Sequence, residues 1–267
     1  MDFKKTAIRF GARVLRLIGI IAVIYVSMVF YLALTERRNA FPRAISHVEA
    51  QKAIEGKASP ITCTVEDGTI LGGWAIGDSA QASLLYYPDA DEDAAQFLAE
   101  VEKLEGVSLL TFNYRGSANN KGTPSQEAFE SDARAILKCA SDWGGTPEFI
   151  AGRGAGAILA AKQASNGQKI ILIDPILSIA DAISDKYGIL YPKFLVRADV
   201  KMPGQNLAAL TPKAILVLDR KKFRDRNHAF FNNLTNLDSL ERGEKTLTRT
   251  LSIITDKQTK NDTTRTE

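Results

Sequence analysis

The chain has 267 residues, of which 45% are hydrophobic and 24% are charged, and its formal net charge is +3. This is the composition of an ordinary globular protein with enough apolar material for a sizeable core. The basic excess lies mainly at the N-terminus, and no basic stripe with interleaved aromatic residues follows, so the sequence gives little support to nucleic-acid binding.

An uncharged apolar run near the N-terminus predicts a single transmembrane helix. It extends from Leu17 to Leu34, about the length that crosses a bilayer as a helix. A cleaved signal peptide is the alternative, but the run is long for one and no small-residue cleavage site follows it. Five basic residues lie in the N-terminal segment 1–16, and three arginines follow the run. The positive-inside rule therefore favours a cytoplasmic N-terminus and a domain on the periplasmic or other extracytoplasmic side.

The rest of the chain reads as a juxtamembrane linker at 35–58, one domain at 59–255 and a polar tail at 256–267. Aliphatic strand patterns separated by helical ones predict an α/β fold, with a mostly parallel sheet covered by helices on both faces. The dipeptide Asp67-Gly68 predicts an antiparallel hairpin at the start of that sheet. The expected strands are 61–66, 69–76, 82–87, 107–114, 148–152, 169–174, 213–219 and 245–254, and the expected helices are 94–106, 125–143, 156–165 and 228–241.

The two cysteines, Cys63 and Cys139, lie in a strand pattern and a helical pattern. Without a C-x-x-C spacing they indicate neither a zinc site nor a thioredoxin-like motif. We interpret them as two separate thiols rather than a disulfide, because free cysteine commonly behaves as a small apolar residue. No carboxylate, histidine or cysteine cluster has metal-ligand spacing, so we expect neither a metal nor another cofactor.

Four motifs carry a resemblance to a known superfamily. They are DGTILGGW at 67–74, FNYRGSANNKGTPSQ at 112–126, GRGAG at 152–156 and KAILVLD at 213–219. In this order they resemble the membrane-anchored branch of the α/β-hydrolase superfamily, related to serine aminopeptidases and prolyl-oligopeptidase-like esterases. The resemblance covers about Ile61 to Leu234. It implies a lid in the segment 176–211 and a nucleophile elbow, the sharp strand-to-helix turn, at GRGAG.

The elbow has lost its nucleophile. Superfamily members place serine in the middle of the turn, where this chain has Gly154. Gly152 and Gly156 remain beside it, and glycine tolerates the strained backbone of such a turn better than serine does. A glycine-rich turn could instead bind phosphate, but GRGAG lacks the Lys-Ser/Thr of a P-loop.

The resemblance also marks the other catalytic positions as altered. The oxyanion motif falls on Tyr87, Pro88 and Asp89, where Pro88 has no N–H group and a carboxylate would repel a developing oxyanion. We interpret this run as an acidic surface turn. The acid position falls on Phe223, and no histidine follows His228, although the superfamily's base lies beyond the last strand.

Three charged residues could reuse the cleft to bind an anion. Arg115 follows a strand, Arg153 lies at the elbow, and Asp174 ends a strand at the edge where α/β proteins usually bind ligands. For all three, a structural role is the interpretation that we favour.

We therefore expect a catalytically inactive membrane protein that acts by binding a protein or a small ligand. The first alternative is an active serine hydrolase or esterase with an unrecognised nucleophile, for instance Ser83, Ser117 or Ser178. The second is a structural component of a membrane complex.

Overall fold

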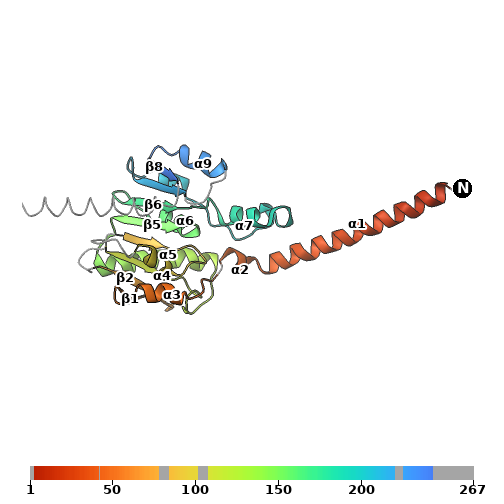
Figure 1. Ribbon diagram of the computed structural model, residues 1–267. Helices are drawn as coiled ribbons and strands as arrows, with labels where there is room; N and C mark the ends of the chain where they lie inside the picture. Colours follow the sequence, from red (N-terminus) through yellow and green to blue (C-terminus); the bar gives the residue numbers. More distant parts are fainter. Residues whose placement is uncertain (1–2, 42, 78–83, 102–107, 220–224, 243–267) are drawn as a thin grey trace, which may run out of the picture.

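The computed structural model describes residues 3–41, 43–77, 84–101, 108–219 and 225–242 of the chain. One long helix, α1 (Phe3–Leu34), extends from the folded domain (Figure 1). Its stretch Ala7–Leu34 is long and apolar enough to cross a membrane, and almost none of it is buried against the domain. The described part of the chain contains one such helix, where the sequence predicts it.

The domain is built on a mixed sheet, as predicted. Among the described residues the strand order is β1-β2-β4-β3-β5-β6-β7-β8. The strand β2 is antiparallel to β1 and β4, and all the other pairs are parallel. The strands are β1 (Ala58–Thr64), β2 (Ile70–Ile76), β3 (Leu84–Tyr87), β4 (Leu109–Phe112), β5 (Phe149–Arg153), β6 (Lys169–Ile173), β7 (Ile215–Asp219) and β8 (Leu237–Arg242).

Helices cover both faces of this sheet. Because side chains alternate along a strand, Leu84 and Tyr86 enter one core, beneath the helices α3 and α4, while Leu85 and Tyr87 enter the other, beneath α5 and α6. Ser125 caps α5 by accepting from the N–H of Ala128 at 3.1 Å. The helices that follow α1 are α2 (Glu36–Ala40), α3 (Val48–Ala53), α4 (Ala94–Val101), α5 (Gln126–Gly144), α6 (Ala155–Gln163), α7 (Ile179–Tyr187), α8 (Gly204–Ala208) and α9 (Asp225–Asn232), with the 3-10 turns η1 (Gly188–Leu190) and η2 (Lys193–Leu195).

The juxtamembrane segment 35–58, which the sequence predicts to be a linker, packs against the domain through its described residues. It contains α2 and α3, and Ile54 is fully buried. The N–H of Ala44 donates to Oγ of Ser117 at 3.0 Å, and the N–H of His47 donates to Oδ2 of Asp93 at 2.7 Å. The segment is therefore held to the loops that follow β4 and β3. Its partners lie far along the chain, so its own short pattern could not reveal them.

The segment 176–211, where the resemblance places a lid, forms α7, η1, η2 and α8 on the side of the domain from which α1 leaves (Figure 1). The hydroxyl of Tyr25 on α1 donates to the carbonyl of Ile189 at 3.1 Å. The hydroxyl of Tyr187 donates to Oδ1 of Asn39 at 3.0 Å. These contacts join α1 and α2 to the segment.

The last predicted helix, 228–241, is wrong in its second half. The helix α9 ends at Asn232, and Leu237–Arg242 forms β8, which pairs with β7. The apolar spacing in this region suits a helix locally, but the free edge of β7 decides its structure. The predicted strand 245–254 and the tail 256–267 lie outside the described residues.

The prediction of two separate thiols is also wrong. Cys63 on β1 and Cys139 on α5 form a disulfide, with their Cα atoms 5.8 Å apart and a sequence separation of 76 residues. That Cα separation is normal for a disulfide. Only the packing of α5 on β1 brings the two together, and neither local pattern contains that information.

Replacing both cysteines, as Cys63→Ala with Cys139→Ala, should lower the unfolding free energy by about 2 to 4 kcal/mol, because the bond restricts the unfolded chain. Thermal unfolding of the full chain in detergent measures this effect. Wild-type protein treated with reductant provides the comparison and should unfold close to the double variant. Rapid reaction of unreduced wild-type protein with a maleimide under denaturing conditions would contradict the bond.

Candidate functional site

The turn between β5 and α6, which the resemblance marks as a nucleophile elbow, is a sharp strand-to-helix turn. Gly154 has φ +53° and ψ −115°, and its N–H donates to the carbonyl of Ile173 at 3.0 Å. L-residues rarely adopt this conformation, so glycine removes the strain that a serine would carry here. The backbone of this turn therefore suits glycine, and its tip carries no side chain that could attack a carbonyl carbon.

The flanking glycines are explained by close packing. A Cβ atom at Gly152 would overlap the carbonyl of Gly156. A Cβ atom at Gly156 would overlap the carbonyl oxygens of Tyr87 and Pro88 at the end of β3. The GRGAG spacing thus lets α6 start directly against two neighbouring strands.

The carboxylate of Asp89 fills the space above Gly154. A Cβ atom at Gly154 would overlap all three atoms of that carboxylate group. Oδ1 of Asp89 accepts the N–H of Ala155 at 2.9 Å and the N–H of Ala90 at 2.8 Å. In α/β-hydrolases the oxyanion donors come from these two places, the residue after the nucleophile and the loop after β3. Oδ1 of Asp89 therefore already accepts one N–H group from each of these two places.

The interpretation of this loop as an acidic surface turn is wrong. Asp89 is half-buried, Glu92 is 8% exposed and Asp93 is fully buried. Asp93 accepts the backbone N–H of His47 at 2.7 Å and the side-chain amide of Asn113 at 3.1 Å. Its acidic composition suggested solvent, but donors from distant segments satisfy these carboxylates inside the protein.

A buried ion pair connects this loop to the elbow. Arg153 pairs with Oε1 of Glu92 and, at 2.6 Å, with Oε2 of Glu100. Oε2 of Glu92 accepts the hydroxyl of Tyr86 at 2.8 Å and the N–H of Asp89 at 2.9 Å. Burial raises the pKa of Glu92, and the charge of Arg153 and the N–H of Asp89 oppose that rise. The network fixes the backbone of Asp89 and so holds its carboxylate over Gly154.

The three residues proposed for anion binding lie in different surroundings. Arg115 donates to Asp132 at 2.7 Å through Nε and to Asp67 at 2.8 Å through a terminal nitrogen. Arg153 contacts other carboxylates, as described above. Asp174 follows β6 with φ +44°, and its N–H donates to the carbonyl of Leu218 at 2.8 Å. Both guanidinium groups thus contact carboxylates of the domain itself.

The remaining triad positions are described only in part. Phe223, where the resemblance places the acid, lies outside the described residues. Asp219 ends β7 and is buried, and His228 is half-buried on α9. Nδ1 of His47 accepts the N–H of Ala50 at 3.2 Å and so caps α3.

The alternative serines that the structure describes act as backbone partners. Oγ of Ser117 accepts the N–H of Ala44, and Oγ of Ser178 accepts the N–H of Asp181 at 2.9 Å as the cap of α7. Both are 2% exposed, and Ser83 lies outside the described residues. In the described part of the chain, no group of His, Cys, Asp or Glu side chains could hold a metal ion.

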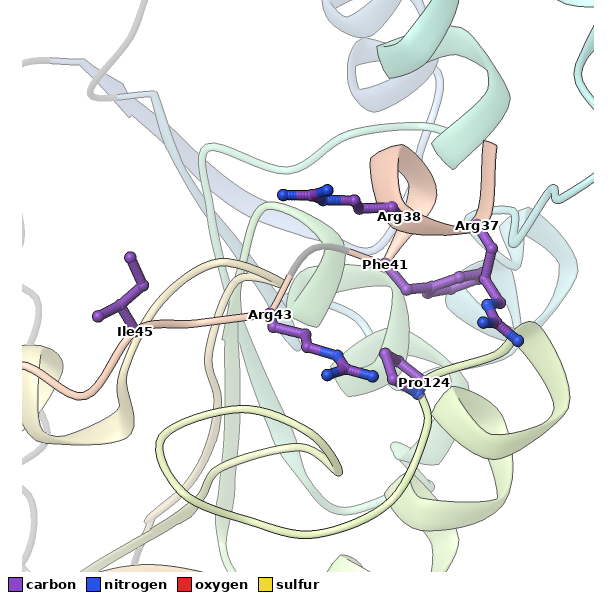
Figure 2. Close-up of a pocket in the computed structure, with 6 residues that line it drawn as sticks. All are labelled: Arg37, Arg38, Phe41, Arg43, Ile45 and Pro124. Carbon is purple, nitrogen blue, oxygen red and sulfur yellow. The ribbon is translucent and has the colours of Figure 1, made fainter. Parts of the chain in front are cut away.

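Two cavities lie away from the elbow. The larger, about 610 Å³, lies beside the juxtamembrane segment (Figure 2). A smaller one of about 50 Å³ lies between α7 and α9. Neither Gly154 nor Asp89 is among the residues that line them. The larger cavity is lined by Arg37, Arg38, Phe41, Arg43, Ile45 and Pro124.

Comparison with curated proteins finds short matches to proteins without an assigned activity. The chain is 28% identical over 136 residues to the uncharacterized protein Rv2307c of Mycobacterium tuberculosis, a match that covers 49% of this chain and 47% of that protein. It is 33% identical over 89 residues to the uncharacterized protein YfhR of Salmonella typhi, covering 30% of each. The chain thus spans less than half the length of these relatives. No family model matches the sequence.

Comparison with solved structures finds extensive likeness. An alpha-beta hydrolase from Vibrio vulnificus matches with a TM-score of 0.63 and 20% identity, covering 86% of this chain and 92% of that one. The Pyrococcus furiosus esterase Pf2001 matches with a TM-score of 0.56 and 16% identity, covering 76% and 86%. The likeness and the strand order together show that this chain has the α/β-hydrolase fold.

Proposed function

We propose that this chain is a membrane-anchored α/β-hydrolase-fold protein that lacks serine-hydrolase activity and acts by binding. One observation carries the proposal: the carboxylate of Asp89 occupies both the space of the nucleophile's side chain at Gly154 and the N–H donor of Ala155. Acyl transfer requires an activated nucleophile and donors aimed at a developing oxyanion. Loss of one triad member alone typically slows such enzymes by several orders of magnitude.

Asp89 itself is a poor candidate for a replacement nucleophile. A carboxylate that attacked a carbonyl would need the neighbouring N–H groups to stabilise the new oxyanion. Those of Ala155 and Ala90 already bind Oδ1 of Asp89. The arrangement therefore favours a permanently occupied oxyanion hole.

The disulfide supports the proposed location of the domain. Disulfides persist in oxidising compartments and are rare in the cytosol. The bond between Cys63 and Cys139 thus agrees with the basic residues at the N-terminal end of α1, which favour a cytoplasmic N-terminus. We infer that α1 anchors the domain on the outer side of a membrane.

A fluorophosphonate probe tests the loss of catalysis. The native full chain in detergent should remain unlabelled, whereas an active serine hydrolase added to the same tube should be labelled. The heat-denatured chain measures non-specific labelling. Labelling of the native chain above that background would contradict the proposal.

The second candidate function is ester hydrolysis, because several proteins of similar structure are named as esterases. Turnover of a p-nitrophenyl ester, followed in the variants Ser83→Ala, Ser117→Ala and Ser178→Ala, tests it. The matched control is Ser141→Ala, which removes a hydroxyl that donates within α5. A turnover that one of the first three changes abolishes, and the control does not, would establish this function.

A further inference from the structure

We propose that the cavity beside the end of α1 binds the phosphate group of an anionic phospholipid. Arg37, Arg38 and Arg43 are arranged around this arginine cavity, with Phe41 and Pro124 between them (Figure 2). Among the residues that the structure describes, its lining contains three cations and no carboxylate. The inference rests on the proposed membrane anchoring of α1 and is independent of the loss of catalysis.

The three guanidinium groups are available to a ligand. All three arginines are exposed, and in the part of the chain that the structure describes no ion pair holds any of them. Guanidinium donors match phosphate oxygens in geometry and form charge-assisted hydrogen bonds with them. Three cations that have no ion-pair partner among the described residues surround one concave space, and they therefore indicate an anionic ligand.

The neighbouring acid does not neutralise these cations. Glu36 precedes Arg37 directly, but it is 6% exposed and turned into the domain. Its carboxylate accepts the N–H of Arg197 at 2.7 Å, the N–H of Ala198 at 2.6 Å and the hydroxyl of Tyr191 at 2.7 Å. The net charge that faces the cavity is thus positive.

The position of the cavity favours a lipid over a soluble phosphate. The helix α1 ends at Leu34, and Arg37 lies about one helical turn beyond it. If α1 crosses a membrane, Arg37 lies at the depth of the lipid headgroups. The bond from Tyr25 to the carbonyl of Ile189 sets η1 beside a residue inside the apolar stretch. Ile189 and Phe194 are 86% and 84% exposed on that side, as expected for residues that contact lipid.

The walls of the cavity suit a molecule that is anionic at one end and apolar at the other. Phe41 is buried and packs against Phe129, with ring centroids 5.4 Å apart, so one wall is fixed. Ile45 is 87% exposed at the rim. The volume of about 610 Å³ lies within the usual range of small-molecule sites.

Native mass spectrometry of the full chain in a neutral detergent tests the proposal. With phosphatidylglycerol we expect one retained lipid, and with phosphatidylcholine at the same concentration none. The variant Arg37→Ala, Arg38→Ala and Arg43→Ala should bind phosphatidylglycerol roughly a hundredfold more weakly, at roughly fivefold for each arginine. The matched control removes three exposed cations elsewhere, Arg134→Ala, Lys138→Ala and Lys213→Ala, and should bind like wild type.

Four results would overturn the proposal. Equal retention of phosphatidylglycerol by both triple variants, or equal loss, would show that the cavity is not the site. Displacement of the lipid by millimolar inorganic phosphate would assign the cavity to a soluble phosphate instead. Alkaline carbonate extraction of cell membranes is run in parallel, because release of the chain there contradicts the anchoring itself. Fluorophosphonate labelling reports separately on catalysis.

Discussion

Replacing Gly154 with alanine should lower the unfolding free energy by about 4 kcal/mol, from backbone strain and overpacking together. At φ +53° a Cβ atom is strained whatever the space, and here it would also overlap the carboxylate of Asp89. The carboxylate cannot move without giving up the N–H groups of Ala155 and Ala90. Thermal or urea unfolding of the full chain in detergent measures the change.

The control for this prediction is Gly167→Ala. Gly167 has φ +94°, but a Cβ atom there would meet nothing within 4 Å, so the change should cost only about 1 kcal/mol. In a double-mutant cycle, Asp89→Ala should remove much of the overlap and make Gly154→Ala less harmful by more than about 1 kcal/mol. Equal losses for the two glycine variants, or additive effects in the cycle, would contradict a carboxylate placed over Gly154.

Replacing Arg153 with methionine should cost about 3 to 5 kcal/mol at neutral pH, because it leaves Glu92 buried without its cation. The guanidinium side chain is 15% exposed and contacts both Glu92 and Glu100. The control is Lys138→Met, which removes an exposed pair with Asp142 and should cost at most about 0.5 kcal/mol. A loss no larger than that of the control would show that the pair contributes nothing.

The Arg153→Met variant should also become relatively more stable in acid. Burial already raises the pKa of Glu92 above its usual value of 4.5, and removing Arg153 raises it further. The folded protein then binds a proton more tightly than the unfolded chain, so stability falls as the pH rises from 4.5 through the folded pKa. The difference from wild type should therefore be greatest at neutral pH and shrink as the pH falls through that window. A difference independent of pH would contradict this origin.

The sequence predicts the fold well wherever the determining pattern is local. A pattern of a few residues predicts each of three features: the hairpin at Asp67-Gly68, the aliphatic strands, and the capped helix after Ser125. Elements that depend on distant partners cannot be predicted from such local patterns. The bond between Cys63 and Cys139 requires β1 to pack on α5, and β8 forms because β7 offers it an edge.

In the candidate site too, local features can be predicted from the sequence and long-range contacts cannot. The absence of a side chain at Gly154 follows from GRGAG alone. The position of Asp89 cannot, because its partner Ala155 is 66 residues away. A local signal does exist at the start of α4, where the side chain of Gln96 accepts the N–H of Asp93 as in a capping box. That pattern marks Asp93 as the beginning of a helix and would have argued against a solvated acidic run.

The hydrogen bonds from Tyr25 to Ile189 and from Tyr187 to Asn39 bear on how a partner could meet this protein. A domain joined to its membrane helix by a flexible linker can rotate and expose each of its sides to a partner. Here these hydrogen bonds hold α1 and α2 to the domain, so a change in the tilt of α1 also changes the tilt of the domain. If α1 crosses a membrane, another membrane protein would therefore meet the same side of the domain at each encounter, at a nearly constant distance from the bilayer. A soluble protein would mainly reach the end of the domain that lies farthest from the membrane.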